Sequence, residues 1–120
     1  MVPGDNPPVN NPTWLQVEAA LGKLTGEETE NSVYLFKEYG EPPYLQVTGE
    51  TGYYMVEFFD ENSYMLINPA QEDSDEEIEI AGFGIINDFP VREVVSLDMA
   101  IQAAKTFFEN GQQDPSSVWK

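Results

Sequence analysis

Carboxylates are the side chains of this chain that are best placed to do chemistry, and few other reactive groups accompany them. The 120 residues include 22 Asp and Glu but no His and no Cys. Thiolate nucleophiles, disulfides and His or Cys metal sites are therefore excluded, and so is the usual general base near neutral pH. Carboxylate or tyrosine chemistry remains, yet no pattern of paired acids and Trp at fixed spacing indicates a glycosidase. We therefore predict that the chain is not an enzyme and needs no cofactor.

One acidic run has part of the spacing of a cation site. Asp73, Asp75 and Glu77 occupy alternate positions, as at the start of a calcium-binding loop. Such a loop needs glycine at its sixth position and a bidentate acid at its twelfth, where this chain has Ile78 and Gly84. The match fails, so we predict no metal site, and a calcium-binding module stays open only as an alternative.

The segment Gly82–Gly84 is a second candidate motif. It has two glycines around Phe83 but lacks the lysine and the other glycines of a phosphate-binding loop. A bulge or turn is the simplest interpretation. The alternative is that Phe83, carried on an acidic loop, inserts into a pocket of a partner as an aromatic anchor.

The charge of the chain is strongly one-sided. Five Lys and Arg against 22 Asp and Glu give a net charge of −17. No Lys or Arg occurs from Glu38 to Val91, although 13 of the carboxylates do. These carboxylates must face either solvent or a positively charged partner, and both interpretations stay open. Nucleic acid and anionic membrane are excluded as direct ligands.

Two helices are predicted. The first begins at Thr13, which forms a capping box with Gln16. The second covers Ser96–Gly111, with Ser96 as the N-cap and Gly111 as the residue that ends it. The apolar residues of the second helix recur at three- and four-residue steps, and we expect its four large ones to be buried: Leu97, Ile101, Phe107 and Phe108.

Between the helices the apolar residues alternate, which predicts β-strands. The predicted strands are Ser32–Tyr39, Tyr44–Thr48, Tyr53–Asp60 and Tyr64–Asn68, followed by a strand around Ile78 and Ile80 and a short strand or extended entry at Val91–Val95. Their Tyr and Phe residues are expected in the core. The element order predicts an α+β fold, an antiparallel sheet of about five strands with two helices packed on one face. We expect residues 1–12 to be a flexible leader and residues 13–120 to be one domain, with Trp119 docked on the core.

The C-terminal segment resembles a known family. The helix AIQAAKTFFENGQ, followed by Pro115, Val118 and Trp119, is similar to the immunity proteins found beside bacterial polymorphic toxins, in particular toxins of the nucleic-acid deaminase superfamily. The specific overlap covers Ala103–Trp119. The resemblance implies a small acidic α+β protein that binds a cognate toxin domain in the producing cell and blocks its active site.

The charge pattern fits that function without the family. Enzymes that act on nucleic acids expose a cationic groove for phosphates, and an acidic surface can occupy it. We therefore predict an immunity protein that binds a basic, nucleic-acid-acting deaminase or nuclease domain in a one-to-one complex. We expect it in the cytoplasm, because no stretch approaches the roughly 18 apolar residues of a membrane span. The alternative is a small acidic module that binds protein or calcium and is unrelated to toxins. The predicted toxin-binding residues are Asp60, Glu61, Glu72, Asp73, Asp75, Glu76, Glu77, Glu79 and Phe83.

Overall fold

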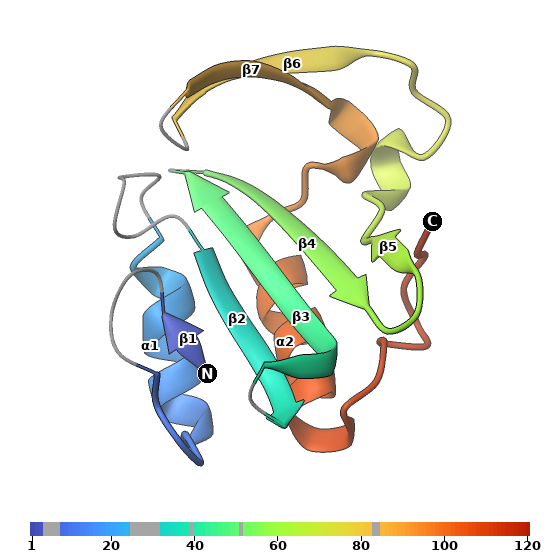
Figure 1. Cartoon of the computed structure of the whole chain (residues 1–120). Helices are drawn as coiled ribbons and strands as arrows, with labels where there is room; N and C mark the ends of the chain where they lie inside the picture. The colour runs from blue at the N-terminus through green and yellow to red at the C-terminus, as the bar shows by residue number, and fades with distance from the viewer. Residues whose placement is uncertain (4–7, 25–31, 39, 51, 83–84) are drawn as a thin grey trace.

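The main sheet has five antiparallel strands, and both helices lie on one of its faces (Figure 1). The computed structural model describes residues 1–3, 8–24, 32–38, 40–50, 52–82 and 85–120. The strand order is β1-β2-β3-β4-β5, and the strands are β1 (Val2–Pro3), β2 (Ser32–Glu38), β3 (Glu41–Glu50), β4 (Tyr53–Phe59) and β5 (Ser63–Met65). The helices are α1 (Trp14–Gly22) and α2 (Leu97–Asn110). The predicted α+β class and the two-helix layer are confirmed.

Helix α2 begins and ends where its sequence predicts. The Ser96 hydroxyl accepts a hydrogen bond from the Met99 N–H (3.2 Å), and Gly111 ends the helix with a φ of 68°. Small residues and one large ring form the buried stripe: Ala100, Ala103, Ala104 and Phe107. Phe108, which we expected in the core, is 39% exposed, because one helical step turns it about 100° away from Phe107. It packs instead against Trp14 of α1, with ring centroids 5.8 Å apart.

Helix α1 carries the predicted capping box. The Gln16 N–H donates to the Thr13 hydroxyl (3.2 Å), and the Thr13 N–H donates to the Gln16 side chain (2.8 Å). Val17 and Leu21 of the helix are buried, and so is Leu24 just beyond it. With nine and 14 residues, neither α1 nor α2 is long enough to cross a membrane, and the described residues contain no helix that is.

The core lies between the helices and the inner face of the sheet. Alternate residues of the three long strands are buried there: Val33, Leu35, Leu45, Val47, Tyr54, Val56 and Phe58. This is the period-two pattern predicted for β2 and β4. The Phe107 ring of α2 meets the edge of Phe58 at a centroid distance of 6.1 Å, which joins helix and sheet.

Both ends of the chain pair along the edges of the sheet. Val2–Pro3, within the predicted leader, adds β1 beside β2. At the other edge the tail runs antiparallel to the end of β5 and the residues that follow it: the Met65 N–H donates to the Lys120 carbonyl (2.9 Å) and the Ile67 N–H to the Val118 carbonyl (2.9 Å). The predicted docking of Trp119 is confirmed, since its ring packs against the core at Phe58, 6.3 Å away.

The acidic strand is not part of the main sheet, contrary to the sequence prediction. Strands β6 (Glu77–Gly82) and β7 (Ile85–Pro90) form a separate two-stranded sheet, which arches over one end of the main one (Figure 1). The chain leaves the main sheet at Pro69, which has no N–H to donate to a neighbouring strand. It then forms the short 3-10 turn η1 (Pro69–Gln71) before β6, and the turn η2 (Val91–Glu93) follows β7. Val91–Val95 is therefore no strand and makes only the single bridge of Val95 to Tyr54.

Candidate functional site

The largest group of predicted site residues lies between η1 and the end of the β6–β7 hairpin. Asn68 fixes the base of this segment: its side-chain oxygen accepts from the Ala70 N–H (3.0 Å), and its side-chain nitrogen donates to the Val94 carbonyl (3.2 Å). Its own N–H donates to the Arg92 carbonyl (2.7 Å), so η1 is held against η2. A short two-stranded hairpin is marginally stable alone. The hydrogen bonds of Asn68 therefore fix the position of the hairpin and of the carboxylates that it carries.

The hairpin has an acidic face and an apolar face. Glu77 and Glu79 are two residues apart on β6 and share a face, and Asp88 of β7 lies directly opposite Glu79 on that face. All three side chains are exposed. Ile78 pairs with Phe89 on the other face, and both are half-buried. The apolar pair therefore packs inward while the carboxylates point to solvent.

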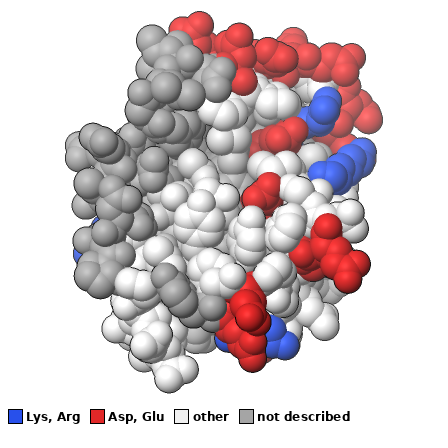
Figure 2. Space-filling model, in the orientation of Figure 1, with Lys and Arg blue, Asp and Glu red and all other residues white. Residues whose placement is uncertain are grey.

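Asp73, Asp75 and Glu76 extend the acidic face toward η1, and all three are exposed. Figure 2 shows carboxylates in a row along the part of the surface that the hairpin forms. We call the set Asp73, Asp75, Glu76, Glu77 and Glu79 the acidic arm. Such a run of like charges raises the negative potential in front of it.

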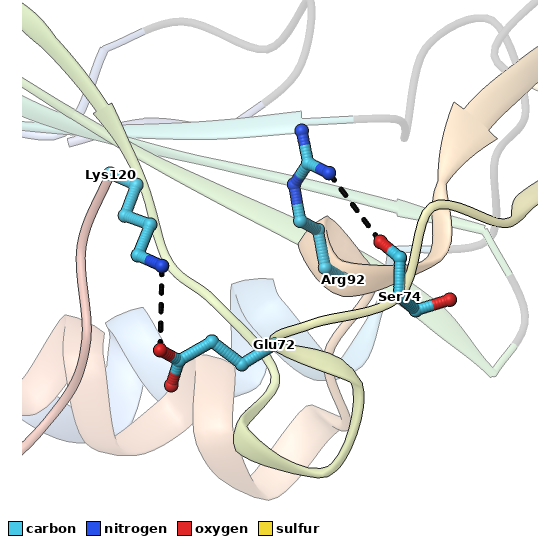
Figure 3. A network of polar contacts seen from close by, with 4 residues as sticks. All are labelled: Glu72, Ser74, Arg92 and Lys120. Carbon is cyan, nitrogen blue, oxygen red and sulfur yellow. Dashed lines mark hydrogen bonds and ion pairs between the residues drawn. The ribbon is translucent and has the colours of Figure 1, made fainter.

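Cations do little to neutralise the acidic arm. Lys120 forms an ion pair with Glu72 (3.3 Å), but both side chains are well exposed, so water screens the pair (Figure 3). Arg92 donates to the carbonyl of Ser74 (3.4 Å) rather than to a carboxylate. Within the described chain, no residue of the acidic arm has an ion-pair partner. The carboxylates of the arm are therefore not held in ion pairs, although Arg92 places one positive charge beside Ser74, between Asp73 and Asp75.

Asp60 and Glu61 lie apart from the acidic arm. They form the turn between β4 and β5, where the Asp60 carboxylate accepts from the Asn62 N–H (2.9 Å). The turn η2, at the base of the hairpin, adjoins the other end of β4, because Val95, just after η2, forms a bridge with Tyr54. Asp60 lies six residue steps along the chain from Tyr54, a distance of about 20 Å in an extended strand. The structure thus divides the predicted site into two acidic clusters, and Phe83 lies outside the described residues, so its role stays a prediction.

The structure also groups four rings that sequence reasoning assigned to the core. Tyr34, Phe36, Tyr44 and Phe59 lie on the outer face of the sheet, opposite the helices, and do not belong to the core cluster. Burial raises the pKa of Tyr44 above its ordinary value, and the nearby Glu57 and Tyr34 raise it further, so its hydroxyl stays protonated. A signal for this face was present in the sequence. Both faces of β2 and β4 are apolar, and two helices can cover only one of them.

The described residues hold no cluster of metal-ligating side chains. Among them, no three carboxylates come close enough together to hold a metal ion. The most buried carboxylate, Asp114, is 4% exposed and is occupied by hydrogen bonds from the tail and α2. The exposed carboxylates therefore give this part of the surface a negative potential, which favours cationic groups.

Comparison with known proteins adds one finding. The family model of Immunity protein Imm1 matches residues 6–120. The match includes α1, α2, strands β2 to β7 and the tail with Trp119. No curated protein matches the chain.

Proposed function

The chain belongs to the Imm1 family of immunity proteins, and from this premise we propose that it binds a cognate secreted toxin domain and covers its cationic active site with an acidic surface. The proposed toxin acts on nucleic acid, as a deaminase or a nuclease. The complex has one copy of each protein and forms in the cytoplasm of the cell that makes both. An immunity protein of this kind acts by binding alone.

The observation that supports the proposal most is that the carboxylates of the acidic arm are exposed and form no ion pairs within the described chain. Self-repulsion of this kind lowers the stability of a compact chain, so a positively charged partner is a physical reason to keep it. A toxin that holds phosphates needs a cationic groove, and the arm offers the complementary potential.

The proposed toxin-binding carboxylates form two clusters. The first is the acidic arm with Glu72, and the second is the turn with Asp60 and Glu61. Because they lie on different connections of the fold, the segment of the β6–β7 hairpin and the β4–β5 turn, the toxin must contact both segments to use both clusters. Charges at the rim of an interface act mainly on the rate of association and on its dependence on salt.

An inhibition assay with matched charge variants tests this proposal. The toxin domain encoded beside this gene is the probe, and the wild-type chain should abolish its activity at about one-to-one stoichiometry. The double change Glu76→Gln and Glu77→Gln should slow association by about two- to tenfold, because it removes negative charge from the arm. The control is Glu18→Gln with Glu109→Gln, which removes the same charge from exposed positions on the helices.

The outcomes separate the parts of the proposal. Equal slowing by both pairs of changes indicates that only the net charge matters, which contradicts a role for the arm. A toxin that stays active in excess wild-type protein contradicts the immunity function toward that toxin. A shift in melting temperature in either variant is measured first, so that loss of fold is not read as loss of binding.

A further inference from the structure

The outer face of the main sheet carries an aromatic row that the fold leaves uncovered by helices. Phe36, Tyr44 and Phe59 are direct cross-strand partners on β2, β3 and β4. Their ring centroids lie 5.6 Å (Phe36 to Tyr44) and 5.2 Å (Tyr44 to Phe59) apart. Tyr34 extends the row, 6.2 Å from Phe36 and 6.0 Å from Tyr44. We call these four residues the aromatic sheet face.

The aromatic sheet face is a second apolar cluster, separate from the core. The core cluster takes the alternate residues of the same strands, such as Leu35, Leu45 and Phe58, which point toward the helices. The four outer rings are half-buried because they pack on one another. Met55 and Met65 lie on the same face by register and add flexible apolar surface. The centre of the view in Figure 2, which looks onto this face, is mostly uncharged.

Most charges around the aromatic sheet face are negative, although Lys120 pairs through its backbone with Met65 at the edge of the sheet and forms an ion pair with Glu72. Glu57 lies on the face beside Tyr44, and its carboxylate accepts a hydrogen bond from the Ser63 hydroxyl (2.5 Å). Asp60 and Glu61 follow at one end of β4, and the acidic arm lies beyond the other end (Figure 1). The outward positions of the described strands β2 to β5 include no Lys or Arg. The face is thus an apolar centre between two acidic clusters.

Aromatic rings next to carboxylates favour a partner with cationic side chains. A guanidinium or ammonium group binds over an aromatic ring and also pairs with a carboxylate, so a basic segment satisfies both the rings and Glu57. A second copy of the chain would bring another −17 to the same surface, which repels it. Nucleic acid is repelled for the same reason.

We propose that the aromatic sheet face is the central contact for the toxin and receives a basic segment of it, with an Arg or Lys side chain stacked on the rings and paired with Glu57. This inference rests on the proposed function and adds where the toxin sits. Aromatic residues at the centre of an interface supply most of the binding energy, while rim charges steer the approach. The two acidic clusters are then the two rims of one surface.

Footprinting of the unmodified protein tests the location. Hydroxyl radicals oxidise accessible Met and aromatic side chains, and the fragments are read by mass spectrometry in the free protein and in the complex with the toxin domain. We expect Tyr44, Met55 and Met65 to be protected several-fold in the complex. Phe108, which is 39% exposed on α2, is the internal control and should be oxidised equally in both samples.

Three variants test the energy of the contact. Tyr44→Ala and Phe59→Ala should each weaken binding of the toxin by about tenfold or more, the scale of a hot-spot side chain. Glu57→Gln keeps the shape of the side chain and should weaken binding several-fold by removing the charge. Leu15→Ala is the matched control, because Leu15 is 75% exposed on α1 and faces away from the sheet. Circular dichroism and a thermal melt confirm that each variant is folded before its affinity is measured.

The outcomes distinguish a wrong location of the toxin contact from a wrong immunity function. Protection of the face together with weaker binding of the folded variants supports the inference. If the wild type inhibits the toxin while the face stays unprotected and the variants bind normally, the inference is overturned and the proposed function stands. Protection that appears in the protein alone and rises with its concentration assigns the face to self-association and overturns the inference. Failure of the wild type to inhibit the toxin overturns the proposed function and, with it, this inference.

Discussion

At the scale of single residues, Asp114 shows what a carboxylate of this chain does when it serves the fold. It is buried, and its oxygens accept hydrogen bonds from Ser116 (2.7 Å from the hydroxyl and 2.9 Å from the N–H), Gln102 (2.9 Å) and Ser117 (3.3 Å). Its carbonyl also accepts from the Trp119 indole N–H (3.1 Å). Asp114 therefore ties the tail to α2, in clear contrast to the carboxylates of the acidic arm.

We predict that Asp114→Asn lowers the free energy of unfolding by about 1 to 3 kcal/mol at neutral pH, because an amide nitrogen would face hydrogen-bond donors. Burial raises the pKa of Asp114, but the hydrogen bonds from Ser116, Gln102 and Ser117 outweigh it, so the pKa lies below its ordinary value of 3.8. A lowered pKa stabilises the fold fully above pH 3.8, and this stabilisation is lost as the pH falls through the pKa of the folded chain. Urea unfolding of both proteins at several pH values from neutral to about pH 2 measures the difference in their free energies of unfolding.

The difference between Asp114→Asn and wild type should shrink as the solution becomes more acidic. Glu109→Gln, at an exposed position near the end of α2, is the control and should have little effect at any pH. A loss of stability in Asp114→Asn that stays constant down to about pH 2 would show that charge on Asp114 contributes nothing.

At the scale of elements, the parts that sequence could predict are those with local causes. The caps of α2 at Ser96 and Gly111 and the alternation of β2 and β4 depend on neighbouring residues, and the structure confirms them. Strand β1 depends instead on β2, which is 30 residues away, and Val2–Pro3 has no pattern of its own. The separation of β6 and β7 from the main sheet depends on the contacts of Asn68 with Val94 and Arg92, which alternation cannot reveal.

Replacing the glycine at the end of each helix by Ala should change the free energy of unfolding in opposite directions. Gly111 has a φ of 68°, and a Cβ there would lie 2.6 Å from Cδ of Lys37, so Gly111→Ala should lower the free energy of unfolding by about 1 to 2 kcal/mol. Gly22 has free space around it, and Gly22→Ala in α1 should raise that free energy by about 0.5 to 1 kcal/mol. Urea unfolding of both variants checks the pair. Equal changes in the two variants would contradict the assigned role of the left-handed conformation at Gly111.

At the scale of the whole molecule, the distribution of charge and of apolar surface matters more than any one group. The sequence predicts an acidic middle segment, and the structure places the acidic arm in solvent. The sequence did not reveal that Asp60 and Glu61 lie apart from the acidic arm, because the position of the arm depends on the contacts of Asn68 with Val94 and Arg92. The aromatic sheet face was missed because alternation shows two apolar faces without telling which one the helices cover.

The central claim is that this surface attracts a cationic toxin, and the rate of association as a function of salt tests it most directly. Stopped-flow mixing with the toxin domain encoded beside the gene gives that rate between about 0.02 and about 0.5 M NaCl, where the screening length falls severalfold. We predict that the rate falls by about tenfold or more over this range, and that it falls less steeply for Glu76→Gln with Glu77→Gln than for wild type. A rate that does not change with salt would contradict the account.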